Sequence, residues 1–162
     1  MSADTTTAII SEVNAGALFL NYVGHASNTT WAHEVILRAR DIGRNDVTMM
    51  SNGGKLPISL DMACLSGNFS DPQYTGIEAK MLDWGAGGTV AGWGATGFGV
   101  ATGHDRLHRG FYDGVFASGL HELGLATIAG KQVLWTSGLS QDLLSTFGLL
   151  GDPALEISLP GS

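Results

Sequence analysis

The residues best suited to chemistry in this sequence are one cysteine and one histidine. Cys64 is the only cysteine of the 162-residue chain, and it directly follows the apolar run 57–63. His25 stands one glycine after a similar run, 17–23. A thiol becomes an effective nucleophile near neutral pH when a neighbour such as an imidazole favours the thiolate. The two residues therefore predict nucleophilic catalysis, provided that the fold brings their side chains together.

The elements around these residues predict an α/β fold. Apolar runs of strand length alternate with segments of helical periodicity, which favours a mostly parallel sheet covered on both faces, a three-layer α/β/α sandwich. Helices are expected over residues 3–15, 31–40, 76–84, 105–118 and 122–136, and strands over 17–23, 57–63, 88–93 and, after the turn 151–153, 154–159.

In such a sheet the functional groups collect beyond the carboxyl ends of the strands, and consecutive strands tend to be neighbours. His25 and Cys64 both stand at such ends. The backbone N–H groups of Ala26 and Cys64, at the same strand-to-loop turns, are candidates for stabilising an oxyanion. The residues alone leave a second interpretation open, because free cysteines are often small buried hydrophobes and a histidine in a glycine turn is often a surface residue.

Composition excludes several classes of protein. The formal net charge is −7 and the eight basic residues are scattered singly, so we expect no nucleic-acid partner. No apolar run approaches the roughly 20 residues that cross a bilayer, and the first ten residues lack the pattern of a signal peptide. A single cysteine permits no intramolecular disulfide, and the length fits one domain over residues 1–162.

Two further motifs favour other chemistry only weakly, and a third is absent. Residues 92–97 match GxGxxG, but another glycine-rich stretch follows where a dinucleotide site needs a helix. His104 and His108 have the i, i+4 spacing of zinc ligands without a third ligand motif. No GxSxG sequence is present, which disfavours a serine hydrolase.

Four strings in order carry a family resemblance: NYVGHAS at 21–27, LPISLDMACLSGNF at 56–69, GGTVAGWGATGFG at 87–99 and LLGDPAL at 149–155. Together they resemble the catalytic domain of the gingipain-type cysteine peptidases, in the clan of caspases and legumains. The resemblance runs from about residue 8 to the C-terminus.

The resemblance implies a cysteine-type endopeptidase that hydrolyses peptide bonds through a thioester acyl-enzyme, without a metal or other cofactor. Cys64 would be the nucleophile, His25 the acid/base partner, and the amides of Ala26 and Cys64 the oxyanion hole. The segment 93–103 would border the substrate pocket, with Trp93, Thr96 and Phe98 as pocket residues. A polypeptide substrate and an extracellular or cell-surface location follow from the same resemblance.

The chain departs from the family pattern in two ways. The usual His-Gly pair is His25-Ala26 here, which adds a Cβ at a turn that favours glycine. The first strand–helix units of the family domain are also missing, so we expect a partial domain whose partner is the missing N-terminal half or another chain at the open sheet edge. The alternative function is a non-catalytic peptidase homologue, or a transpeptidase-like module of bacterial surface secretion.

Overall fold

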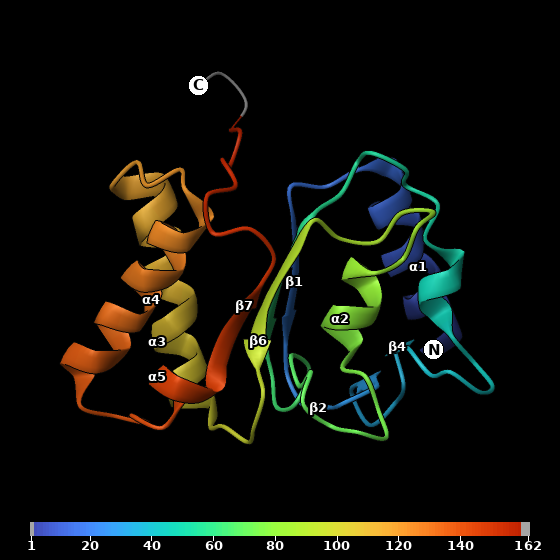
Figure 1. Cartoon of the computed structure of the whole chain (residues 1–162), viewed down its shortest axis with the longest axis horizontal. Helices are drawn as coiled ribbons and strands as arrows, with labels where there is room; N and C mark the ends of the chain where they lie inside the picture. Colours follow the sequence, from blue (N-terminus) through green and yellow to red (C-terminus); the bar gives the residue numbers. More distant parts are fainter. Residues whose placement is uncertain (1, 160–162) are drawn as a thin grey trace.

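A four-stranded sheet forms the centre of the molecule, in a computed structural model that describes residues 2–159 (Figure 1). Its strands are β1 (Phe19–Val23), β5 (Ile58–Met62), β6 (Ala91–Ala95) and β7 (Phe147–Leu150), in the order β1-β5-β6-β7. The first three strands are parallel and β7 is antiparallel to β6. The prediction of a mostly parallel sheet with consecutive strands side by side is confirmed.

Helices cover both faces of this sheet. α1 (Ser2–Ala15) and the short α2 (Ile77–Leu82) lie on one face; α3 (Ala101–Tyr112), α4 (Leu123–Ser137) and α5 (Leu143–Thr146) lie on the other, and the π-helical segment η2 (Asp113–Ala117) extends α3 (Figure 1). Strand alternation explains the two layers. Ile58, Leu60 and Met62 of β5 join the α3/α4 core, and this leaves Ser59 and Asp61 pointing toward α2. The predicted three-layer α/β/α sandwich is confirmed.

A small antiparallel sheet follows β1, where the sequence predicted a helix over 31–40. It consists of β2 (Ala26–Ser27), β3 (Thr30–Trp31) and β4 (Leu37–Arg38), and the 3-10 helix η1 (Asp46–Met49) comes after it. The helix prediction was wrong because Ala32 and Val35 take positive φ values of 61° and 58°, which no right-handed helix accepts. Trp31 and Leu37 pair across strands and pack in the α1/α2 core, so their burial does not follow helical spacing.

The C-terminal strand also differs from the prediction. The strand β7 comes before the turn at 151–153, whereas residues 154–159 contribute one isolated bridge, between Glu156 and Glu122. Phe147 is buried against Trp93 of β6, and this apolar contact fixes the earlier segment as the edge strand. Within residues 2–159, no helix has both the length and the apolar character that spanning a membrane requires.

Candidate active site

The sheet places His25 and Cys64 at matching positions on neighbouring strands. The last residue pair of the parallel β1–β5 ladder is Val23 with Met62, and each candidate residue stands two positions beyond it. The Gly24 N–H donates to the Met62 carbonyl oxygen at 3.3 Å, which ties the two strand ends together. The sequence predicted that the strands before His25 and Cys64 are neighbours, and the strand order confirms this.

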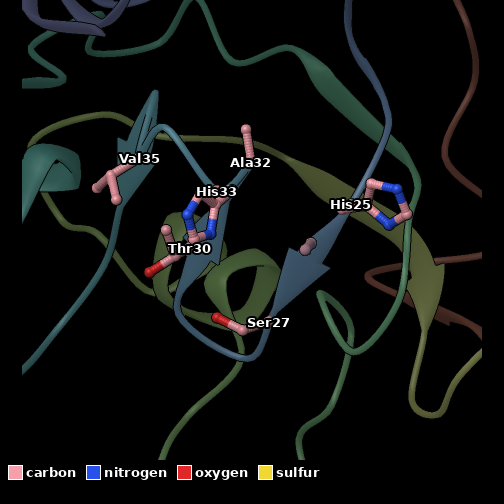
Figure 2. Close-up of a pocket in the computed structure, with 7 residues that line it drawn as sticks. His25, Ser27, Thr30, Ala32, His33 and Val35 are labelled. Atoms are coloured by element: carbon pink, nitrogen blue, oxygen red, sulfur yellow. The ribbon is translucent and has the colours of Figure 1, made fainter.

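His25 is exposed, and its backbone is held by two hydrogen bonds. The Tyr22 hydroxyl donates to the His25 carbonyl oxygen at 2.6 Å, and the Ala32 N–H donates to the same oxygen at 2.8 Å. Figure 2 shows His25 at one side of a pocket whose other lining residues come from β2, β3 and the loop between β3 and β4. This pocket has a volume of about 340 Å³ and is lined by His25, Ala26, Ser27, Thr30, Ala32, His33 and Val35.

Cys64 is half-buried, and its thiol lies against the loop after β6. The Gly99 N–H donates to Sγ at 3.4 Å, and Sγ lies 3.6 Å from the Gly99 carbonyl oxygen. No hydrogen bond joins the Cys64 thiol to His25 in the part of the chain that the structure describes. Leu65, the next residue, has a φ of 61°, a costly conformation for a residue with a side chain. Cys64 therefore stands on a sharp turn directly after β5.

Two backbone amides beside these residues lack a competing acceptor. The Cys64 N–H has no partner within residues 2–159. Ala26 is opposite Trp31 in the β2–β3 pair, next to the hydrogen-bonded position of His25 and Ala32. Because bonded and non-bonded pairs alternate in an antiparallel ladder, the Ala26 N–H points away from β3.

The three residues predicted for a substrate pocket separate in the structure. Trp93 has no exposed surface and packs against Phe111 and Phe147 in the α3/α4 core, so the assignment of its side chain to an open pocket is corrected. Strand alternation is the reason, because Trp93 shares a face of β6 with two buried alanines. Thr96 is half-buried and donates to the Thr146 carbonyl oxygen, whereas Phe98 is 77% exposed on the loop beyond.

Two buried carboxyl groups, those of Asp61 and Glu78, lie beneath the site, and the sequence predicted a function for neither of them. Asp61 accepts hydrogen bonds from Trp31 Nε1 and from the Ser59 hydroxyl, each at 2.8 Å. Burial has the larger effect and raises the pKa of Asp61 to about 7, although these two bonds lower it. Glu78 of α2 has no hydrogen-bond partner on either oxygen, and burial together with the nearby Asp61 raises its pKa well above the usual range. Alternation of polar and apolar residues in β5 was the sequence signal for Asp61.

The glycines of the GxGxxG match have a packing role. A Cβ on Gly94 would lie 2.7 Å from both carboxyl oxygens of Glu78, and a Cβ on Gly92 would lie 3.0 Å from the Glu78 Cβ. These glycines therefore make room for a buried acid under β6.

A buried histidine, His104, stands near the thiol. A Cβ on Gly99 would lie 2.5 Å from His104 Nε2, a nitrogen that has no partner in the described residues. Burial lowers the pKa of His104, which favours the neutral imidazole. Its i, i+4 partner His108 bonds Asn21 instead, and residues 2–159 contain no cluster of three or more potential metal ligands.

Comparison with known proteins places the chain in a family. The model of peptidase family C25 matches residues 2–158. Gingipain R2 and gingipain R1 of Porphyromonas gingivalis are each 34% identical to it over 77 residues, which is 48% of this chain but only 10% and 7% of those proteins.

Solved structures agree on the fold. The crystal structure of the Arg-specific cysteine proteinase gingipain R superposes with a TM-score of 0.80 at 23% identity, over 94% of this chain and 36% of that one. The complex of Porphyromonas gingivalis RgpB pro- and mature domains superposes with a TM-score of 0.79, also at 23% identity, over 94% of this chain and 37% of that one. This chain thus spans about a third of the solved relatives.

This three-layer α/β/α sandwich with a mostly parallel sheet is a caspase-like fold. The chain belongs to peptidase family C25.

Proposed function

We propose that this chain forms the His/Cys part of a cysteine-type endopeptidase, with Cys64 as nucleophile and His25 as acid/base. The observation that carries the proposal is the equal offset of the two residues beyond the last β1–β5 pair. Membership of family C25 supports the same chemistry. The open position of His25 and the half-buried thiol suit a reaction at the surface of the sheet.

The proposed reaction has two steps. The Cys64 thiolate attacks the carbonyl carbon of a peptide bond, and the amides of Ala26 and Cys64 stabilise the resulting oxyanion. His25 protonates the leaving amine as the C–N bond breaks, which leaves a thioester on Cys64. Water then attacks the thioester and gives its proton to His25, and the thiolate leaves with the electrons of the C–S bond.

The strand order suggests how a polypeptide lies across this site. β5 stands between β1 and β6, so Cys64 stands between His25 and the loop after β6. Since His25 must reach the leaving amine, the amine side of the substrate lies toward β1 and the pocket in Figure 2. The acyl side then lies toward Thr96 and Phe98, the accessible members of the predicted substrate pocket.

We further propose that a companion segment pairs with β1, either the N-terminal half found in longer relatives or another chain. Among the described residues only β5 pairs with β1, so its other edge is open. The chain's short share of its relatives supports this proposal. An extracellular or cell-surface location remains part of the proposal, on the strength of the family resemblance.

A reactivity measurement tests the dyad, because Cys64 is the only cysteine. Intact-mass labelling by an electrophilic peptidyl probe near pH 7 is expected to be fast, to disappear on denaturation, and to slow at least about tenfold in His25→Ala. His121→Ala is a matched control, since its site lies beside the Glu122–Glu156 bridge, away from the carboxyl ends of the parallel strands. Labelling at the rate of a free thiol, unaffected by His25→Ala, would contradict the proposal.

A non-catalytic homologue is the second candidate, and two observations favour it. The Cys64 thiol already makes hydrogen bonds with the Gly99 backbone. Among the described residues, no carboxylate makes a hydrogen bond with the His25 imidazole. Under this alternative the labelling stays slow even when a companion segment is added. In a transpeptidase an amine would replace water in the second step, so an added amine would appear in the product.

A further inference from the structure

Asp61 is a fully buried carboxyl group only three residues before the nucleophile, yet the proposed reaction gives it no part. Its Oδ2 accepts the hydrogen bond of Trp31 Nε1 at 2.8 Å, and its Oδ1 accepts that of the Ser59 hydroxyl at 2.8 Å. The Asp61–Trp31 bond joins β5, which carries Cys64, to β3 of the small antiparallel sheet.

Trp31 reaches the histidine loop by two routes. Its backbone pairs with Ala26, whose amide is the proposed oxyanion donor. Its indole stacks on Tyr22 with ring centroids 4.6 Å apart and planes 8° from parallel. The Tyr22 hydroxyl in turn donates to the His25 carbonyl oxygen at 2.6 Å.

The fit around this path is close. A Cβ on Gly24 would lie 2.7 Å from the Tyr22 hydroxyl oxygen, so the glycine lets the ring pass under the loop. Trp31 is 1% exposed, and a buried indole N–H without an acceptor is costly. Asp61 supplies that acceptor, and through it the indole has one defined position.

We infer that Asp61 is a positioning residue for the His25–Ala26 loop and acts through the indole of Trp31. The role as a catalytic aid rests on the proposed function, whereas the mechanical link from Asp61 to the loop does not. Asp61 thereby couples the strand of the nucleophile to the loop that carries the acid/base and the oxyanion amide.

The charged neighbours of Asp61 are consistent with this role. Glu78 faces it from α2, and Tyr22 faces it from β1. Burial raises the pKa of Glu78 well above the usual range and also raises that of Tyr22, which favours the neutral form of both groups. Burial raises the pKa of Asp61, but the hydrogen bonds from Ser59 and Trp31 lower it and so favour the carboxylate form. A hydrogen bond from the indole to a carboxylate is stronger than one to a neutral group.

Three variants and one control test the link. Asp61→Leu and Trp31→Phe each remove one partner of the bond, and Asp61→Asn keeps an acceptor oxygen of similar shape. Trp84→Phe is the matched control, because its indole donates to the Met50 carbonyl oxygen and packs against the same α1/α2 core without touching the loop. The first readout is hydrogen exchange at the Ala32 amide, which donates to the His25 carbonyl oxygen.

We expect Ala32 exchange to accelerate by about tenfold in Asp61→Leu and in Trp31→Phe, and to stay near the wild-type rate in Asp61→Asn and Trp84→Phe. The second readout is peptide hydrolysis: kcat falls at least about tenfold in the first two variants with KM within about twofold, and Asp61→Asn restores it.

The two readouts separate the two ideas. In one outcome the wild-type chain hydrolyses no peptide, while Ala32 exchange in the variants still changes as expected. The peptidase proposal then fails and the positioning link stands. If Ala32 exchange in folded Trp31→Phe equals that of wild type, the link is refuted whatever the activity. Should Asp61→Leu not fold, Trp31→Phe and Asp61→Asn still decide the question.

Discussion

The Asp61 carboxyl links ionisation to folding. Its pKa is about 7 in the folded chain and near 3.8 without the fold, so between these values the folded state holds more protons than the unfolded state. Stability contributed by this group is fully present below pH 4 and is lost as pH rises through about 7.

Asp61→Asn is therefore expected to change the pH dependence of stability. In wild type the group lowers the free energy of unfolding by up to about 1.4 kcal/mol per pH unit between pH 4 and 7. The variant lacks this slope, which urea unfolding at several pH values can measure. Parallel curves for the two proteins would show that Asp61 ionises normally in the fold.

Two tryptophans with opposite surroundings give a second prediction. Trp93 is fully buried between β6 and α3, and Trp135 is 66% exposed on α4. Trp93→Ala should lower the free energy of unfolding by about 3–5 kcal/mol, and Trp135→Ala by less than about 1 kcal/mol. Chemical denaturation of both variants checks the contrast, and equal losses would mean that the exposed indole is packed in solution.

Single residues were predictable where position on a strand decides their surroundings. His25 and Cys64 follow apolar runs, and the rule for parallel sheets brings such ends together. Trp93 was misplaced because the family resemblance assigned the whole segment 93–103 to the pocket, although side chains on a strand alternate between faces. The bond between Asp61 and Trp31 spans 30 residues and needs the fold to be seen.

Among the elements, β6 and α2 depend on each other through the glycines of β6. Gly94→Ala places a Cβ against the Glu78 carboxyl and should lower the free energy of unfolding by about 1–3 kcal/mol. Glu78→Ala in the same chain removes the obstacle, so the double variant should recover part of that loss. Gly85→Ala, whose Cβ meets no atom within 4 Å, is the control. Additive losses in the double variant would contradict the clash.

The strands and long helices were predictable from apolar periodicity, and the small antiparallel sheet was not. Residues 31–40 carry good helix formers, but Ala32 and Val35 at positive φ turn the chain back so that Leu37 pairs with Trp31. Tertiary contacts from β1, α1 and α2 outweigh local propensity there. No local sequence pattern predicts a positive φ at an alanine and a valine.

At the scale of the whole molecule, the hydrogen bonds of β1 show which of its amides point to the open edge of the sheet. The Leu18 carbonyl and the Gly24 N–H bond to β5, so even-numbered residues between them face β5. In a parallel strand the amides of Phe19, Asn21 and Val23 then point to the open edge.

These three amides should exchange with solvent much faster than those of Leu20 and Tyr22 in the chain alone. Adding a companion segment that pairs with β1 should protect the three and leave the other two unchanged. Hydrogen exchange resolved by residue measures both states. Equal protection along β1 in the isolated chain would mean that the edge is already covered.

The glycines of β6 also limit which substitutions this family of sequences can accept. A side chain at position 94 meets the Glu78 carboxyl unless Glu78 has first been shortened, so the order of the two substitutions matters. A chain that keeps the acid is expected to keep glycine at 94, whereas a chain without the acid has room for a side chain there. Once a side chain fills that space, a return to glutamate at 78 would meet it. The pair would then act as an evolutionary ratchet.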